Sequence, residues 1–340
     1  MDPRQPHITR RTALKTLGAA AGLAGAAPAL AAPRRRDDIG VLVDLTRCDG
    51  CPDAGTPRCV AACRAKNQAR YPEPDPDRPI PDYWPQKRHE DWRPRREDTG
   101  TLTPYNWTFV QRVTVEHGGR THELHLQRRC MHCDNPTCAA TCPFSVIETK
   151  PGGAVHILPH LCVGGAKCRA VCPWDIPQRQ AGVGIYTKAA PKLGGGGVMY
   201  KCDLCFDRLA EGKSPECVAA CRQRLGEEAP LLSGPRAEVV ALARHRARQI
   251  GGFTYGDVDN GGTGTVYVSP VPFEAIDQAL RAREKERFFF PANPNPLAEA
   301  HAAMKAVLWA PLAGAAGALL AGARALAASK RNQEEREGGK

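Results

Sequence analysis

Residues 130–173 read CMHCDNPTCAATCPFSVIETKPGGAVHILPHLCVGGAKCRAVCP, and this stretch decides the fold. Cysteines at these spacings are typical ligands of ferredoxin-type iron–sulfur clusters. Three thiolates on one loop bind one cluster, and the fourth, three residues later, reaches a second cluster. The second half departs from this pattern at one place, because glycine stands at position 165 where a cysteine is expected.

Two further cysteine groups flank this stretch, and they read Cys48-x2-Cys51-x7-Cys59-x3-Cys63 and Cys202-x2-Cys205-x11-Cys217-x3-Cys221. All fifteen cysteines therefore lie between residues 48 and 221. Such density indicates either a disulfide framework in an exported protein or a set of metal ligands. A closing pair with three residues between its cysteines recurs in all four groups, and a disulfide framework gives no reason for that repeat. The spacing therefore favours iron–sulfur ligation.

The arrangement of two-cluster ferredoxins predicts which cysteines share a cluster, because the fourth cysteine of each group binds the cluster of the other group. Three [4Fe-4S] sets follow: Cys48, Cys51, Cys59 with Cys221; Cys202, Cys205, Cys217 with Cys63; and Cys130, Cys133, Cys138 with Cys172. The remaining set holds Cys162, Cys168 and Cys142, with Gly165 in the fourth place. Three thiolates predict a [3Fe-4S] cluster there. The alternatives are a [4Fe-4S] cluster with water or hydroxide on one iron, or with a recruited non-cysteine ligand.

The fold class expected from this organisation is α+β, with two ferredoxin-like modules. Residues 33–69 together with 198–232 form the outer half, and residues 130–190 form the central half. Residues 70–129 are an insertion that is rich in proline and ends in a β-hairpin, and residues 233–303 are a C-terminal extension. The outer pairing joins the start of the chain to residue 221, so the insertion loops out without opening the fold.

Local patterns predict the main elements between the cysteine groups. A strand is expected over residues 40–44, a hairpin over 107–127 with its turn at 117–120, a helix over 235–249, a strand over 264–269 and a helix over 273–283. Residues 70–104 are expected to be an extended loop, whose Trp84, Trp92 and Trp107 anchor either a partner or the protein's own loop. The glycine run at 192–197 is interpreted as a flexible tether.

Both ends of the 340-residue chain indicate export and anchoring. Residues 1–32 resemble a twin-arginine signal peptide, with Arg10 and Arg11 before an apolar run and Ala29-Leu30-Ala31 as a cleavage site. Residues 304–328 contain eighteen uncharged residues, Ala306 to Ala323, and predict a transmembrane helix, with 329–340 as a cytoplasmic tail. A buried helix is the alternative for 304–328.

The net charge of +11 suits an anionic lipid surface, an acidic protein partner or nucleic acid. Nucleic-acid binding is disfavoured, because no nucleic-acid motif accompanies scattered basic residues. Among the histidines, His132 stands between two cysteines and is expected to donate to a cluster sulfur rather than to bind iron. His122 and His125 lie on the hairpin and are expected to have ordinary surface or core roles.

The order of the four groups, the insertion after the first and the central Cys130-Met131-His132-Cys133 resemble the four-cluster iron–sulfur subunits of membrane-bound respiratory oxidoreductases. That family serves nickel–iron hydrogenase and molybdopterin enzymes such as formate dehydrogenase, nitrate reductase, and dimethylsulfoxide and polysulfide reductases. The resemblance covers roughly residues 38–275. The signal peptide and the anchor narrow it to the hydrogenase and formate dehydrogenase subunits. In nitrate reductase-like members the position equivalent to 165 also departs from cysteine, and the implied cluster is [3Fe-4S].

Two features depart from this resemblance. Arg64 and Arg222 follow the closing cysteines of the first and last groups, where the central groups have Pro143 and Pro173. Residue 165 is glycine rather than the tryptophan of nitrate reductase-like relatives.

The resemblance implies an electron-transfer subunit without substrate chemistry of its own. It implies transfer between a periplasmic catalytic subunit, a hydrogenase or a molybdopterin enzyme, and a membrane cytochrome b or quinone protein, with the central clusters on the membrane side. A rival interpretation is a periplasmic assembly or structural protein that uses zinc or disulfides. Closed tetrahedral zinc sites fit these spacings less well. A self-sufficient reductase is disfavoured, because no flavin, nicotinamide or molybdopterin motif is present.

Overall fold

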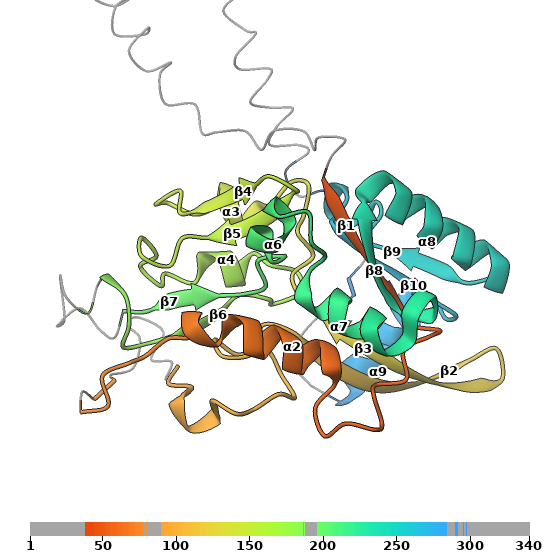
Figure 1. Ribbon diagram of the computed structural model, residues 1–340, viewed down its shortest axis with the longest axis horizontal. Coiled ribbons are helices and arrows are strands. Elements are labelled where there is room, and N and C mark those ends of the chain that lie inside the picture. The colour runs from red at the N-terminus through yellow and green to blue at the C-terminus, as the bar shows by residue number, and fades with distance from the viewer. Residues whose placement is uncertain are drawn as a thin grey trace, which may run out of the picture. The chain divides into compact units, whose positions relative to one another are not determined.

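The computed structural model describes residues 38–77, 79–80, 90–185, 187, 196–283, 290–291, 295 and 297. The chain divides into two compact units, Met1–Ala292 and Asn293–Lys340, and the described helices and strands all lie in the first (Figure 1). The strands are β1 (Ile39–Asp44), β2 (Phe109–His117), β3 (Arg120–Arg128), β4 (Ile147–Lys150), β5 (Ala154–Ile157), β6 (Gln178–Gln180), β7 (Val198–Tyr200), β8 (Leu231–Pro235), β9 (Phe253–Tyr255) and β10 (Thr265–Ser269). The helices are α2 (Arg58–Asn67), α3 (Thr137–Ala140), α4 (Lys167–Ala170), α6 (Phe206–Ala210), α7 (Glu216–Leu225), α8 (Arg236–Ile250) and α9 (Phe273–Arg283). Short 3-10 turns lie at Gln68–Arg70, Arg93–Arg95, Gly226–Glu228 and Asp259–Gly261.

A four-stranded sheet with the order β8-β1-β10-β9 carries one end of this unit. Strand β1 is parallel to β10 and antiparallel to β8, and β9 is antiparallel to β10. Helix α8 covers one face of the sheet (Figure 1). On that face Leu42, Val266 and Val268 pack against Val239 and Ala243 of the helix. Residues 265–269 therefore complete the sheet that begins just before the first cysteine group.

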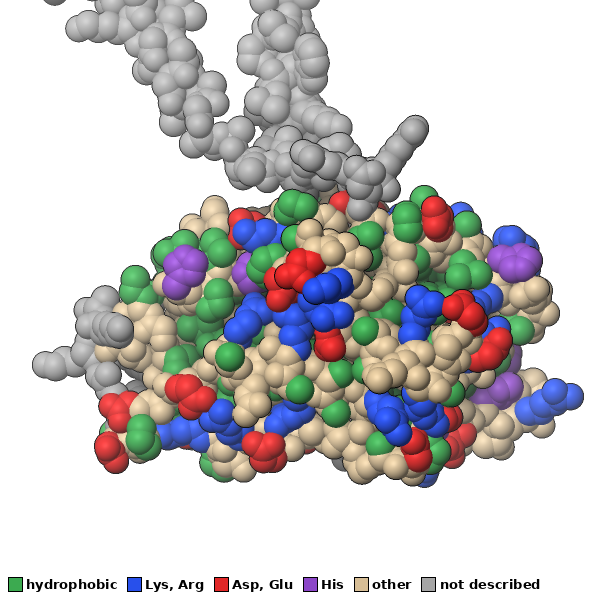
Figure 2. Space-filling view, viewed as in Figure 1, with side chains coloured by type: hydrophobic (Ala, Val, Ile, Leu, Met, Phe, Trp, Pro, Cys, Tyr) green, Lys and Arg blue, Asp and Glu red, His purple; other side chains and the backbone are tan. Residues whose placement is uncertain are grey.

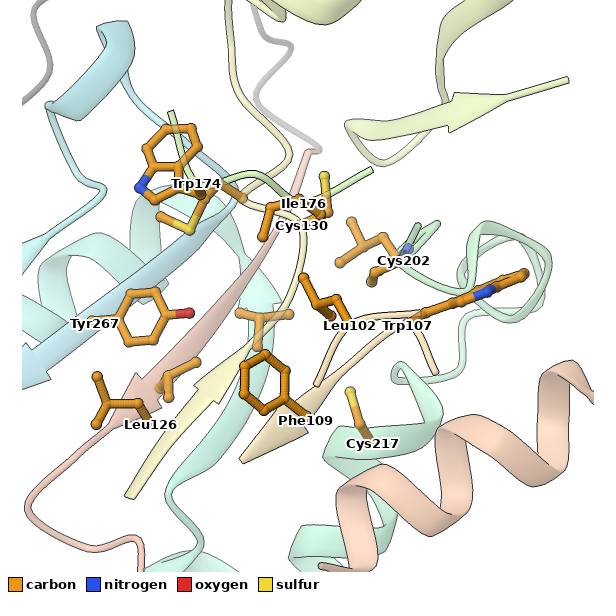
Figure 3. Packing of buried hydrophobic residues seen from close by; sticks show 14 of the residues in the cluster. Leu102, Trp107, Phe109, Leu126, Cys130, Trp174, Ile176, Cys202, Cys217 and Tyr267 are labelled. Carbon is orange, nitrogen blue, oxygen red and sulfur yellow. Dashed lines mark hydrogen bonds between the residues drawn. The ribbon is translucent and has the colours of Figure 1, made fainter. Parts of the chain in front are cut away.

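The opposite face of the sheet joins the main core, because side chains alternate between the two faces of a strand. Val41, Val43 and Tyr267 point into this core. The core also contains cysteines, and Figure 3 shows Cys130, Cys202 and Cys217 among aromatic and aliphatic side chains such as Trp107 and Phe109. Cysteine thiols are thus part of the hydrophobic core rather than of the surface.

The β2–β3 hairpin is confirmed, with Phe109 opposite Arg128 and His117 opposite Arg120. Its two turn residues, Gly118 and Gly119, both have positive φ, which suits the tight turn that joins two strands. Helix α9 packs against β2.

The helices that carry cysteines in the central half, α3 and α4, have four residues each, and the cysteine-bearing segments of this half adjoin two-stranded ribbons. Strand β4 pairs with β5, and β6 pairs with β7. Helices α2 and α7 are longer and lie side by side (Figure 1). This pairing brings the first and last cysteine groups together.

Other local predictions are also confirmed. The structure has a strand at Ile39–Asp44, helices at Arg236–Ile250 and Phe273–Arg283, and a strand at Thr265–Ser269. Strands β8 and β9 were not predicted: β8 pairs with β1, which lies far earlier in the sequence, and β9 has only three residues. The domain boundaries proposed from the sequence stay predictions, and within the first unit the sheet joins strands of the outer half to strands of the C-terminal extension.

The insertion packs on its own protein where it is described. Trp107 is buried, and its indole N–H donates to the carbonyl of Pro104 over 2.8 Å. Buried Glu90 accepts from Arg169 Nη2 over 2.5 Å and from Arg179 Nε. The insertion is therefore fixed to the central half at this point, and the alternative that its aromatic residues cover the protein's own loops is confirmed for Trp107.

Several predicted features lie outside the described residues, namely the signal peptide 1–32, Trp84, residues 192–195 of the glycine run, the segment 304–328 and the tail 329–340. Within the described ranges no helix has the length and apolar character that crossing a bilayer requires. Gly197, the described end of the glycine run, is not a tether: a Cβ there would lie 2.5 Å from the carbonyl oxygen of Gln180.

Charged side chains of both signs share the surface seen in Figure 2. Lys66 pairs with Asp207 over 2.8 Å, and Arg222 pairs with Glu227 over 2.7 Å. Part of the positive charge of the surface is thus neutralised by neighbouring carboxylates.

Candidate iron–sulfur sites

The fifteen cysteines all lie in the described part of the chain, and all of them are free of disulfides. Cys59 and Cys63 lie on α2, and Cys217 and Cys221 lie on α7. Residues four apart share one face of a helix, so each of these pairs faces the same side. Cys138 lies on α3 and Cys168 lies on α4. The remaining cysteines lie on the loops that precede or follow the helices.

The loops that open each group bend so that backbone N–H groups point at sulfur. The amide of His132 donates to Cys130 Sγ over 3.5 Å, and the amide of Leu204 donates to Cys202 Sγ over 3.4 Å. His132 and Leu204 both have positive φ, at 50° and 59°. Non-glycine residues adopt this conformation rarely, and here it aims the N–H donors at the sulfur two residues earlier.

Four sets of thiols converge, and we number them in their spatial order. Site 1 is Cys48, Cys51, Cys59 and Cys221, which line one cavity. In site 2, Cys63 faces Cys202, Cys205 and Cys217. In site 3, Cys133 faces Cys130, Cys138 and Cys172. In site 4, Cys142, Cys162 and Cys168 line a second cavity together with Gly165.

Consecutive sites adjoin one another. Cys59 of site 1 faces Cys217 of site 2. Cys202 of site 2 faces Cys130 of site 3, and Cys168 of site 4 faces Cys138 of site 3. Figure 3 labels Cys130 and Cys202 in the same part of the core. The four sites therefore form a row with sites 1 and 4 at its ends. The structure brings together the same thiols that the crossed pairing groups, and their ligation of clusters stays a prediction.

Site 4 opens to solvent at the position where the fourth cysteine is missing. Gly165 is exposed, and a Cβ at this residue would meet no atom within 4 Å. The preceding Gly164 has φ +70°, and a Cβ there would lie 2.6 Å from the carbonyl oxygen of Gly197. Glycine is thus required at 164 by close packing, whereas at 165 nothing in the structure requires it. Phe144, which lines the cavity, is 53% exposed.

Comparison with known proteins supports the assignment of these cysteine groups to iron–sulfur binding. Two family models, both described as 4Fe-4S dicluster domains, match residues 47–146 and 122–227, and together they span all four cysteine groups. A protein of Nitratidesulfovibrio vulgaris is 33% identical over 280 residues, which cover 79% of this chain and 66% of that protein. This chain belongs to the ferredoxin-type iron–sulfur subunits of respiratory oxidoreductases.

Two further relatives of this iron–sulfur subunit carry names that describe their complexes. The hydrogenase-2 operon protein HybA of Escherichia coli O157:H7 is 27% identical over 311 residues, covering 79% of this chain and 83% of that protein. The iron–sulfur subunit of nitrate-inducible formate dehydrogenase from Escherichia coli K12 is 26% identical, covering 68% of each chain. The subunit spans about two thirds of the length of the N. vulgaris relative.

The residues around site 2 fit an anionic cluster. Arg129 is buried and donates from Nη1 to Cys217 Sγ over 3.4 Å, while its Nε and Nη2 have no hydrogen-bond partner. Within the described residues no carboxylate pairs with this guanidinium. A buried cation is costly without a facing anion, and thiolate-bound iron–sulfur clusters carry net negative charge. Burial would lower the pKa of Arg129, yet negative charge on the sulfurs of Cys202, Cys217 and Cys205 raises it above its usual value.

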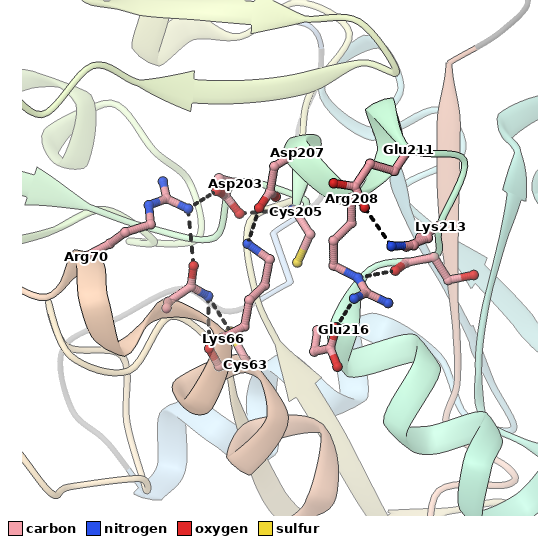
Figure 4. Close-up of polar contacts among 12 residues, drawn as sticks. Cys63, Lys66, Arg70, Asp203, Cys205, Asp207, Arg208, Glu211, Lys213 and Glu216 are labelled. Carbon is pink, nitrogen blue, oxygen red and sulfur yellow. Dashed lines mark hydrogen bonds and ion pairs between the residues drawn. The ribbon is translucent and has the colours of Figure 1, made fainter.

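Carboxylates near site 2 are neutralised by ion pairs that Figure 4 shows beside Cys63 and Cys205. Asp203 accepts from Arg70 over 2.5 Å and from the amide of Cys205 over 2.9 Å. The side chain of Asn67 donates to Cys63 Sγ over 3.6 Å. The negative charge of Asp203 is therefore held by Arg70 and the loop amide beside the site.

Burial raises the pKa of most of these thiols above that of a free cysteine. It raises the pKa of Cys48 and Cys138 to about 11, and that of Cys168 and Cys172 to about 12. Thiolates are the form that binds metal, so cluster insertion releases protons. Within the described ranges, no three His, Cys, Asp or Glu side chains lie close enough together to hold one metal ion. In a cubane each thiolate binds a different iron, so its sulfurs stand farther apart.

Some of the residues at these sites were predicted from the sequence and some were not. The ring of His132 contacts Cys202 Sγ at 3.5 Å, so this histidine does lie against a ligand sulfur, although of site 2 rather than of its own loop. The ring of His125 lies against Gly50 of the first cysteine loop. Arg129 and Lys201 were missed. Their signal was a basic residue directly before the first cysteine of a group, which the sequence also shows at Arg47.

Proposed function

We propose that this iron–sulfur subunit carries single electrons along the row of four sites between a catalytic subunit and a membrane protein. The observation that carries the proposal is the adjacency of the sites, because each has thiols that face thiols of the next. Bound clusters would supply the one-electron carriers. The chain itself contributes thiolate ligands, N–H donors and a buried path.

We propose three [4Fe-4S] clusters at sites 1, 2 and 3 and one [3Fe-4S] cluster at site 4. Sites 1, 2 and 3 each have four thiols, whereas site 4 has three beside Gly165. Cluster type and charge influence reduction potential, and a [3Fe-4S] cluster at an end of the row would have a higher potential than its neighbours. A high-potential end suits exchange of electrons with a quinone. We therefore place site 4 toward the membrane partner, a cytochrome b or quinone protein.

The catalytic partner in this proposal is a periplasmic hydrogenase or a molybdopterin enzyme. The names of the HybA and formate dehydrogenase relatives support these two possibilities. Export by the twin-arginine route through residues 1–32, a single anchor at 304–328 and a cytoplasmic tail at 329–340 belong to the same proposal. Their support is the sequence alone: the paired Arg10 and Arg11 and the uncharged run from Ala306 to Ala323.

The test is purification of the tagged full-length subunit with its native partners from detergent-solubilised membranes. We expect a brown complex that contains iron and acid-labile sulfide, a co-purifying hydrogenase or molybdopterin protein, and cluster reduction when hydrogen or the substrate of that enzyme is added. A colourless subunit with stoichiometric zinc would overturn the proposal in favour of the structural or assembly role. A brown subunit whose clusters no co-purifying enzyme can reduce would overturn the proposed partner.

A further inference from the structure

His132 lies between two sites and contacts a sulfur of each. It is 0% exposed. Its backbone N–H donates to Cys130 Sγ of site 3 over 3.5 Å, and its ring Nε2 lies 3.5 Å from Cys202 Sγ of site 2. A single residue therefore joins sulfurs from the two inner sites.

The orientation of the ring decides which nitrogen donates. The backbone N–H of Val155 donates to His132 Nδ1 over 3.1 Å, so Nδ1 carries a lone pair. In a neutral imidazole the proton then resides on Nε2, which is the nitrogen that faces Cys202 Sγ. The ring is thus fixed as a hydrogen-bond donor to site 2.

Two buried cations flank His132. Arg129 donates to Cys217 Sγ of site 2 and has two further donors, Nε and Nη2, without a partner. Lys201 is buried and donates to the carbonyl oxygens of Val155 and Cys202, and its ammonium faces the thiols of Cys130 and Cys138 in site 3. Hydrogen-bond donors and positive charge are therefore concentrated between the two inner sites.

The end sites have a different environment. At site 1, Arg224 pairs with Asp49 over 2.6 Å and reaches Cys51 Sγ only at 4.0 Å. Arg58, which lines the same cavity, pairs with Asp53 over 2.8 Å. At site 4 the residue before the first cysteine is Leu161, which is 46% exposed. A backbone N–H donates to sulfur at site 4 as well, from Met199 to Cys162 Sγ over 3.5 Å. What distinguishes the two inner sites is the buried Arg129 and Lys201, whose positive charges face their sulfurs.

We propose that Arg129, His132 and Lys201 are positioning residues that raise the reduction potentials of the clusters at sites 2 and 3 and connect these clusters. The proposal rests on the proposed function, since it needs clusters at these sites. Hydrogen bonds to sulfur and nearby positive charge stabilise the reduced cluster, which carries one more negative charge. With clusters held by the cysteines of sites 2 and 3, the electron that one cluster loses would be the electron that its neighbour gains, so the transfer balances. No proton and no other reactant takes part.

The test is an EPR-monitored redox titration of the purified complex in the wild type and in single variants. Arg129→Met and His132→Phe remove donors from site 2, and Lys201→Met removes a cation from site 3. Both oxidation states of the cluster accept the hydrogen bond, and only the difference between them changes the potential. We expect each loss to lower the reduction equilibrium constant by about tenfold, which is about 59 mV for one electron. Signals are assigned with Cys63→Ser for site 2 and Cys133→Ser for site 3.

Matched variants separate this role from a merely structural one. His132→Gln keeps a side-chain donor and acceptor, and Arg129→Lys keeps the charge, so both retain potentials closer to the wild type. Arg244→Met is the control, because it removes a surface cation that pairs with Asp257 over 2.9 Å, and all potentials should stay unchanged.

Two outcomes are distinguishable. If the wild-type complex contains no clusters, the proposed function fails. If the wild type contains its clusters but His132→Phe and Lys201→Met leave every potential unchanged, only the present inference is overturned. Should Arg129→Met fail to assemble its cluster, these two variants still decide the question.

Discussion

Replacement of Gly165 by cysteine tests the assignment of site 4 directly. The structure has room for the new side chain, because a Cβ at residue 165 meets no atom within 4 Å and its φ lies outside the left-handed range. The substitution should change the free energy of unfolding by no more than about 0.5–1 kcal/mol. Any change in the cluster is then attributable to the new thiolate.

We expect Gly165→Cys to convert site 4 from three thiolate ligands to four. Iron content should rise by about one atom per chain, since a [3Fe-4S] cluster lacks one corner of the cube. Low-temperature EPR of the air-oxidised wild type should show a [3Fe-4S] signal that disappears in the variant. A reduced [4Fe-4S] signal of lower potential should replace it.

Two control variants separate ligation from local disturbance. Gly165→Ala adds a Cβ without a ligand, so the [3Fe-4S] signal should persist. Gly164→Cys places a Cβ 2.6 Å from a backbone oxygen at a residue with φ +70°, so it should perturb the loop. The reasoning is refuted if the wild type shows no [3Fe-4S] signal and Mössbauer spectra reveal four [4Fe-4S] clusters. Persistence of the signal and of the iron content in Gly165→Cys would refute it as well.

Three further predictions concern stability, measured by denaturant unfolding. Gly40→Ala should lower the free energy of unfolding by about 1–3 kcal/mol, because the added Cβ would lie 3.0 Å from helix α8. A Cβ added at its cross-strand partner Gly234 would meet no atom within 4 Å. A comparable loss in Gly234→Ala would therefore contradict this account. Glu90→Ala should cost about 3–5 kcal/mol, because it leaves two arginines buried without their carboxylate, whereas Glu97→Ala at an exposed pair should cost at most about 1 kcal/mol. Burial lowers the pKa of His156 to about 4. As the pH falls, the unfolded chain therefore binds this proton first, near pH 6.5. The contribution of His156 to the free energy of unfolding should be complete above pH 6.5 and about 1 kcal/mol smaller at pH 5.5. His156→Phe should remove that loss, and an unchanged pH profile in the variant would exclude His156 as its source.

The grouping of the cysteines followed from the sequence because cluster ligation imposes strict spacing. In the first group the third and fourth cysteines, Cys59 and Cys63, lie one turn apart on the same face of α2. The turn of helix between them separates their thiols, so that Cys59 faces site 1 and Cys63 faces site 2. Local elements such as α8 and the β2–β3 hairpin also followed, because their periodicity and turn residues lie within one stretch of chain.

Other features depend on contacts between distant residues and could not be predicted. Strand β1 pairs in parallel with β10, and Val41 lies opposite Thr265, a register that nothing near either strand encodes. A basic residue precedes the first cysteine in three groups, yet these residues have different environments. Arg47 pairs with Glu228 at the surface over 2.7 Å, whereas Arg129 is buried against sulfur. Only packing distinguishes the two.

Burial explains why the inner sites need cations and the end sites do not. An added electron places a further negative charge on a cluster, and in a buried, weakly polarisable interior that charge is costly unless a fixed cation or donor faces it. Site 4 opens to water at Gly165, and site 1 has surface charges beside it, so solvent stabilises reduction at both ends. All four cysteines of site 2 are buried, and so is Cys130 of site 3, which faces site 2. In our proposal, without Arg129, His132 and Lys201 the middle of the row would be an energetic barrier to electron transfer. The same burial that insulates the path therefore makes these three residues necessary.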